Sequence, residues 1–149
     1  MSRILDILAA IAGLAPAVDG VTPAVWEPDD LHVSAESADL PVRVISPFDE
    51  AGGAMVAFTS AAGNRTAEWT ISDILLWRET GMGRGPADVG LTLPQYIAAY
   101  LEELDTLRHP QYRVINATMR AGAVIWPAGT DRQYDGVRVT LTIRELLGG

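Results

Sequence analysis

A strict alternation of apolar and polar residues marks the end of the chain. Residues 137–144 place an apolar side chain at every second position: Val137, Val139, Leu141 and Ile143. Successive side chains of a strand point to opposite faces of a sheet, so this pattern predicts a strand with one face on the core and one face exposed. Residues 112–119 alternate in the same way and predict its hairpin partner, with residues 121–136 as an irregular connection.

Earlier segments rich in β-branched and aromatic residues predict further strands. Residues 41–47 are bracketed by prolines, which indicates a strand near a sheet edge because proline cannot donate a hydrogen bond to a neighbouring strand. Residues 54–60 and 66–78 follow, and the Gly-Asn sequence in the turn at 61–65 predicts that they form a hairpin. A short strand is also expected at Ala24–Trp26.

Two segments have the spacing of amphipathic helices. Residues 2–14 bring apolar side chains onto one stripe, and Gly13 ends the predicted helix. The second helix is expected to begin at Thr92, because Thr92 and Gln95 have the form of a capping box, and to end before Pro110. Its apolar face consists of Leu93, Tyr96, Ile97, Tyr100, Leu101, Leu104 and Leu107.

The order helix, strands, helix, strands predicts an α+β fold in a single domain, residues 1–149. We expect a mostly antiparallel sheet of about four to six strands, with the N-terminal helix and the central helix packed on one face. The chain has no apolar stretch of the ~20 residues that a membrane span needs, and Asp6 interrupts the short apolar run at the N-terminus, which argues against a signal peptide. We therefore expect a protein that is assembled in the cytoplasm.

Composition narrows the chemistry that the chain can perform. It contains no cysteine and no lysine, which excludes disulfides, thiolate metal sites, a cysteine nucleophile, a Schiff base and a P-loop lysine. Nineteen Asp and Glu against eleven Arg give a net charge of −8, which argues against a protein that grips nucleic acid or an anionic membrane. We expect no catalytic activity, no cofactor and no bound metal.

One acidic cluster keeps a different function open. Asp29, Asp30 and His32 offer two carboxylates and an imidazole within four residues, which is a possible set of ligands for a divalent metal. A small ligand-binding domain or enzyme built on this region is the alternative from a different class, and a solvated turn after Pro28 is the simpler interpretation. His109 lies at a predicted helix end, where an imidazole can interact with the terminal carbonyls.

Large apolar and cationic residues gather in predicted loops and at strand ends. Tryptophan and arginine are enriched at the energetic centres of protein interfaces. Met82 and Arg84 lie in a glycine-rich loop at 81–86, which we expect to order on a partner. An equally good interpretation of the tryptophans is that they cover the core. The candidate interface residues are Trp77, Arg78, Met82, Arg84, Trp126 and Arg132.

This order of elements resembles the tail terminator proteins of long-tailed, siphovirus-like bacteriophages. Those proteins have an N-terminal helix, an edge strand before an acidic glycine-containing turn, a long hairpin, one amphipathic helix and a closing hairpin. The resemblance spans nearly the whole chain in pattern and length. The matching segments are Ile4–Leu14, Pro41–Ser46, Met55–Trp77, Leu93–Leu107 and Tyr112–Ile143.

The resemblance implies a structural protein of the virion tail or neck rather than an enzyme. Its subunits would form a ring, typically a hexamer, that caps the head-proximal end of the tail tube, ends tube polymerisation and offers a docking surface for the head. The implied partners are further copies of itself, the major tail tube protein and a head-completion or connector protein, while DNA only passes through the lumen and no membrane is involved. A head-completion or head–tail connector protein of the same neck is the alternative that the resemblance leaves open.

Overall fold

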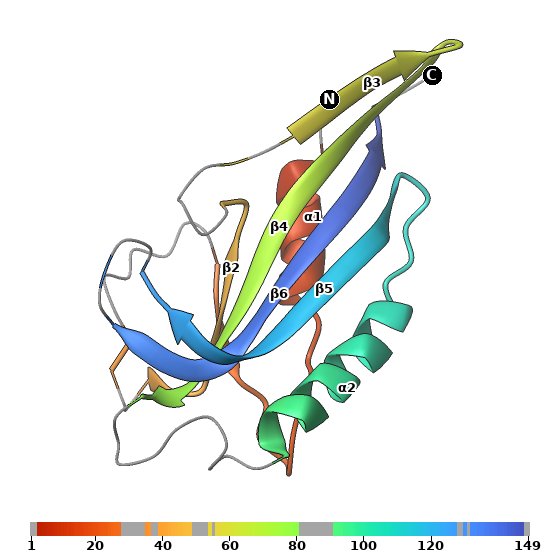
Figure 1. Ribbon diagram of the computed structural model, residues 1–149. Coiled ribbons are helices and arrows are strands. Elements are labelled where there is room, and N and C mark those ends of the chain that lie inside the picture. Colours follow the sequence, from red (N-terminus) through yellow and green to blue (C-terminus); the bar gives the residue numbers. More distant parts are fainter. Residues whose placement is uncertain are drawn as a thin grey trace.

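The fold is α+β, as the order of elements predicts (Figure 1). The computed structural model describes residues 3–27, 35–36, 39–48, 54, 56–80, 91–127, 130 and 132–147. Its strands form one six-stranded sheet, in which β1 and β2 are parallel and the other pairs are antiparallel. The elements are α1 (Ile4–Ala12), β1 (Ala24–Trp26), β2 (Val42–Ser46), β3 (Val56–Ala61), β4 (Asn64–Glu79), α2 (Thr92–Asp105), β5 (Tyr112–Ile125) and β6 (Gln133–Leu146).

β4 is the central strand, and its 16 residues pair with two different strands along one edge. Its first part, Asn64–Trp69, pairs with β3, and Ser72–Leu76 pairs with β2. β6 runs along the other edge of β4 and carries β5 on its far side, so the order is β1-β2-β4-β6-β5, with β3 beside the start of β4. The strand predicted at 41–47 therefore lies one strand in from the edge that β1 forms.

Both helices cover the same face of the sheet. α1 lies behind β4 and β6 in Figure 1, and the apolar side chains of α1 and α2 join one core, the main core, with those of β4 and β6. The alternation predicted for the last strand is confirmed, because its apolar set is fully buried in this core: Val137, Val139, Leu141 and Ile143. Among the residues that the structure describes, no helix is long and apolar enough to cross a bilayer.

A second, smaller core lies on the other face, near the end of the sheet where β4 finishes. It joins side chains of β2, β4, β5 and β6 to Ala35 and Leu40 from the connection before β2. The rest of this face, toward the start of β4, has no covering helix or strand in the described part of the chain. We call it the open face; it spans Glu68–Thr70 of β4, Arg138–Arg144 of β6 and Arg113–Arg120 of β5.

The closing hairpin is longer than the sequence predicts. The irregular connection expected at 121–136 is wrong, because β5 continues to Ile125 and β6 already begins at Gln133. A Cβ atom at Gly136 would lie 1.9 Å from the carbonyl oxygen of Leu75. Glycine therefore permits a close approach of β4 and β6 inside the sheet, and at this position it does not mark a loop.

The N-cap of α2 lies one residue earlier than the capping box predicts, and the helix also ends earlier than predicted. Its N-cap is Leu91 rather than Thr92, and no side chain caps it. The backbone N–H of Gln95 donates to the carbonyl oxygen of Leu91 at 2.8 Å, so this N–H does not bind the Thr92 hydroxyl and the predicted capping box is absent. The helix also ends at Asp105, several residues before Pro110.

Substitutions on the two faces of β6 test this orientation. Leu141→Asp puts a charge without a counter-ion into the main core and should prevent folding to a soluble protein. Thr140→Asp lies on the open face and should change the free energy of unfolding by only about 1 kcal/mol or less. Far-UV circular dichroism and thermal melts measure both effects, and equal unfolding of both variants would show that β6 is buried on both faces.

Candidate functional site

Arg43 and Asp73 form an ion pair inside the main core. Both side chains are fully buried, and the guanidinium Nη2 and Nε lie 2.5 and 3.2 Å from the two carboxylate oxygens. The guanidinium also donates to the carbonyl oxygens of Ile11 at 3.1 Å and Leu14 at 2.5 Å, at the end of α1. The hydroxyl of Tyr100 in α2 donates to Asp73 at 2.6 Å. The network therefore ties both helices to β2 and β4.

Burial and the ion pair together fix the charges of this network. Burial acts to lower the pKa of Arg43, but the charge of Asp73 and the hydrogen bonds to it outweigh burial and raise that pKa above its ordinary value. Burial raises the pKa of Tyr100 well above that of a free phenol, and the charge of Asp73 raises it further. Burial likewise raises the pKa of Tyr96. At neutral pH the cluster is a guanidinium–carboxylate pair beside two neutral phenols, and it is closed to solvent. It therefore holds the core together and offers no exposed group to a substrate.

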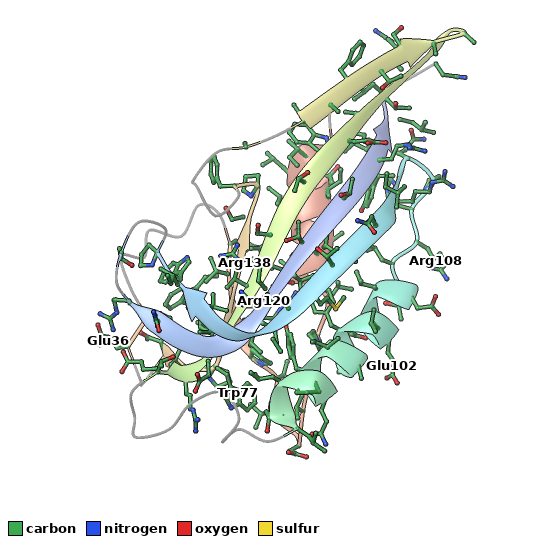
Figure 2. All side chains as sticks on the ribbon, viewed as in Figure 1. Glu36, Trp77, Glu102, Arg108, Arg120 and Arg138 are labelled. Atoms are coloured by element: carbon green, nitrogen blue, oxygen red, sulfur yellow. The ribbon has the colours of Figure 1, made fainter. Side chains whose placement is uncertain are left out.

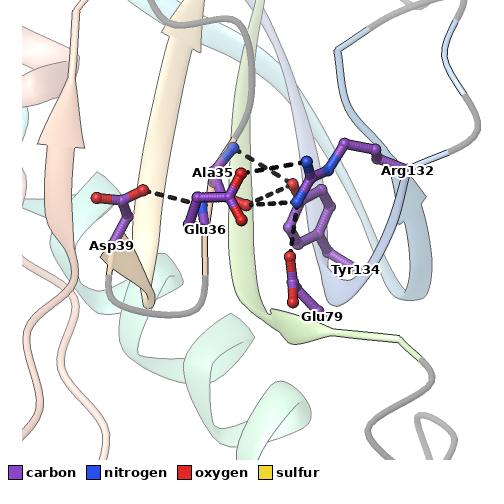
Figure 3. Close-up of polar contacts among 6 residues, drawn as sticks. All are labelled: Ala35, Glu36, Asp39, Glu79, Arg132 and Tyr134. Carbon is purple, nitrogen blue, oxygen red and sulfur yellow. Dashed lines mark hydrogen bonds and ion pairs between the residues drawn. The ribbon is translucent and has the colours of Figure 1, made fainter.

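Two of the candidate interface arginines bind carboxylates of their own chain at the end of β4. Arg78 donates to Asp135 at 2.6 Å. Arg132 donates to Glu79 at 2.7 Å and to Glu36 at 3.3 Å (Figure 3). These bonds hold the segment before β2 against β4 and β6. The structure thus brings Arg78 and Arg132 to one end of the sheet, as parts of an internal network.

The two candidate tryptophans pack in different cores. Trp77 is partly buried and packs against the main core. Trp126 lies in the second core with its ring 5.7 Å from that of Trp26, centroid to centroid. Both positions agree with the interpretation that the tryptophans cover the core, and their role at an interface stays a prediction. Met82 and Arg84 lie outside the described residues.

The sequence also singles out an acidic cluster and a histidine for metal or catalytic chemistry. The cluster at 29–32 lies outside the described residues. His109 stacks on the ring of Tyr112 with the centroids 4.2 Å apart, and its Nδ1 accepts the backbone N–H of Gln111 at 3.0 Å. Within the described ranges, no three His, Asp or Glu side chains gather as metal ligands would. His109 is therefore part of the local packing between α2 and β5.

The hairpin of β3 and β4, residues 56–69, projects from the sheet as an arm (Figure 1). All six residues of β3 are exposed, and the apolar side chains of Phe58 and Val56 are 63% and 49% exposed. Val56 lies opposite Trp69, which packs on the main core, so Val56 and Phe58 point to the side that the helices cover elsewhere. The apolar side of the sheet thus continues onto the arm, beyond the helices.

β3 also lacks the features that protect exposed edge strands from other chains. Such strands usually carry a charge, a proline or a bulge. β3 contains no charged residue and no proline, pairs without a register shift, and has β4 as its one partner among the described strands. An exposed, uncharged and partly apolar edge fits a surface that another protein covers. The sequence predicts this hairpin but not its exposure, because Val56–Ala61 has the composition of a core strand.

Removal of Asp73 tests how far the fold depends on the ion pair. Asp73→Ala leaves the Arg43 guanidinium buried without its counter-ion and should lower the free energy of unfolding by about 3–5 kcal/mol. Arg43→Met combined with Asp73→Leu removes both charges and should cost less than Asp73→Ala alone. Denaturant unfolding followed by tryptophan fluorescence gives both values, and a cost below about 1 kcal/mol for Asp73→Ala would contradict the dependence.

Alkaline pH should destabilise the protein through Tyr96 and Tyr100. Both phenols have raised pKa values in the folded state, whereas the ordinary value of 10.0 holds in the unfolded chain. Below pH 10.0 the folded and unfolded states both keep the phenol protons, so the two tyrosines contribute fully to stability. Above pH 10.0 the unfolded chain releases these protons first, so the free energy of unfolding falls as the pH rises. Tyrosinate absorbance and circular dichroism test this together, since Tyr96 and Tyr100 should ionise only with unfolding. Ionisation of Tyr96 or Tyr100 in the folded protein would contradict it.

Comparison with known proteins gives no family assignment. No protein-family model matches the chain, and no curated protein matches it either. The function is therefore inferred from the arm and the other surfaces of the chain itself.

Proposed function

We propose that the protein is a structural protein of a bacteriophage virion that forms a ring, a hexamer as in tail terminators, at the head-proximal end of the tail tube. The ring ends polymerisation of the tube and provides the surface onto which the head docks. Its partners are further copies of itself, the major tail tube protein and a head-completion or connector protein. DNA passes through the lumen of the ring.

The observation that carries the proposal is the arm. It stands off the sheet with Val56 and Phe58 of β3 exposed and with an unprotected strand edge, whereas the buried polar network is closed to solvent. These features support a function that depends on contacts with other proteins. We assign the arm to the tube end, because an exposed strand edge can extend the sheet of a neighbouring protein by backbone hydrogen bonds.

The remaining features are consistent with this role. The order of an N-terminal helix, a long hairpin, one amphipathic helix and a closing hairpin is the pattern on which the resemblance to tail terminators rests. A net charge of −8 disfavours binding of phosphates, so that DNA moves through the ring without being held. Arginine, the sole cationic residue besides histidine, pairs with carboxylates in a bidentate geometry that suits contacts between subunits.

An assay of tube capping tests the proposal. Purified protein is added to tail tubes grown from the major tail tube protein of the same genome, and negative-stain electron microscopy records tube ends and lengths. Val56→Ser with Phe58→Ser removes the apolar side of the arm and should leave the thermal midpoint within about 4 °C of the wild type, because both side chains are exposed. The variant should fail to cap, and the tubes should grow overlong.

The matched control is Leu5→Ser, which removes another exposed apolar side chain, on α1 and away from the arm; Leu5 is 78% exposed. This variant should cap tubes as the wild type does. Normal capping by the arm variant would remove the arm from the mechanism. Folded wild-type protein that never joins the tubes would reject the terminator function, and binding to heads instead would assign the protein to head completion.

A further inference from the structure

A groove runs between the end of α2 and the start of β5. Its volume is about 400 Å³, which is the size of a ligand-binding pocket. Figure 2 shows Arg108 just after the end of α2, where the chain turns toward β5. The apolar wall of the groove consists of Leu101, Leu104 and Leu107, and the side chain of Leu101 is 53% exposed. The opposite wall belongs to β5.

The β5 wall of the groove is the edge of this strand rather than one of its faces. Tyr112, Arg113 and Val114 all line the groove, although successive side chains of a strand point to opposite faces. Tyr112 and Val114 pack on the main core, whereas Arg113 points to the open face. A second hollow of about 290 Å³ shares Tyr112 and Arg113 with the groove and continues to Arg144. β5 ends the sheet, with β6 as its one partner among the described strands.

The register leaves backbone groups of β5 unused at this edge. The backbone N–H of Leu146 donates to the carbonyl oxygen of Gln111 at 2.8 Å, so these two residues form a hydrogen-bonded pair. Hydrogen-bonded and non-hydrogen-bonded pairs alternate along an antiparallel ladder. Tyr112 and Val114 therefore occupy non-hydrogen-bonded pairs and direct their N–H and C=O groups away from β6, toward the groove. Within the described part of the chain, no other group binds them.

Arg113 supplies the charge of this site. Its side chain is exposed and forms no ion pair or hydrogen bond with the described residues. Arg108 and Arg144 also line the two hollows, but they bind Asp105 at 3.4 Å and Glu68 at 2.6 Å. The site thus combines an apolar wall, unused backbone groups and one uncompensated cation.

We infer that the groove binds a short extended segment of a partner protein, which adds as a strand to the edge of β5. Residues opposite each other on neighbouring strands point to the same face. The residue opposite Arg113 therefore carries a carboxylate, and its two neighbours, opposite Tyr112 and Val114, carry aliphatic side chains that contact the leucines of α2. The ligand has the pattern aliphatic, acidic, aliphatic. This inference is independent of the proposed function, because the groove and the arm share no residue.

The shape of β5 favours a short segment over the sheet edge of a second copy. The register shifts between Val114 and Asn116, and such a bulge interrupts pairing along the strand. Beyond the bulge, the charge of Arg120 further disfavours strand pairing. The exposed strand β3 of a second copy contains no charged residue, so it does not supply the carboxylate that Arg113 would bind.

Fluorescein-labelled pentapeptides with blocked ends test the inference. Positions two and four are Leu, Ile or Val, the central residue is Asp or Glu, and the outer residues are Thr. Fluorescence polarisation measures their binding to the whole chain. Arg113→Glu should weaken binding at least about tenfold, and a peptide with Lys at the centre should bind this variant again. Arg120→Glu is the matched control, because it reverses another exposed arginine of β5, beyond the bulge, and should stay within about twofold of the wild type.

Hydrogen exchange followed by NMR tests the strand addition itself. The bound peptide should slow exchange of the Tyr112 and Val114 amides at least about tenfold, because their N–H groups then have acceptors. The amide of Arg113, which already bonds to β6, should change less. A peptide that is N-methylated at its three central amides keeps the side chains but loses these donors, and it should bind at least about tenfold more weakly.

Three results would overturn the inference. The first is that no peptide of the panel binds at up to about 1 mM, and self-association that Arg113→Glu abolishes would then assign the groove to a second copy. The second is equal weakening of binding by Arg113→Glu and Arg120→Glu. The third is that the N-methylated peptide binds as its parent does, which would assign the groove to small carboxylates. Capping of tubes is measured without these peptides, so neither outcome depends on the other.

Discussion

The ion pair between Arg43 and Asp73 is the interaction on which the arrangement of the helices depends. A guanidinium inside an apolar core costs several kcal/mol unless its donors and its counter-ion are satisfied. Here the partners come from three elements: the carbonyls at the end of α1, Asp73 of β4, and Tyr100 of α2, whose hydroxyl donates to the Asp73 carboxylate. These charges are satisfied only when both helices lie over the same face of the sheet.

Because both helices cover the same face of the sheet, other parts of the sheet remain uncovered. β4 continues past the main core into the arm, and the other face has the second core at one end alone. The arm, which we assign to assembly, is therefore a part of the sheet that the helices do not reach. Arg78 and Arg132, by contrast, bind carboxylates of their own chain and stabilise the end of the sheet.

The sequence predicts those elements whose residues follow one local rule. The alternation at 137–144 predicts β6 because one face is buried and the other is not, whereas at 121–136 small residues remove this contrast although the strands continue. Arg43 has the appearance of an exposed strand residue, and its burial depends on Asp73, 30 positions further on. No short pattern relates the two. The arginines of the open face also come together only through the register of β5 and β6.

β4 is one unbroken strand from the tip of the arm to the far end of the sheet (Figure 1). Its hydrogen bonds to β6 lie across the strand direction, so a pull along β4 loads many of them at once. A pull at right angles to β4 would instead open the pairs between β3 and β4 one after another, from the end. The molecule is thus mechanically anisotropic: it resists tension along the arm and yields to peeling across it.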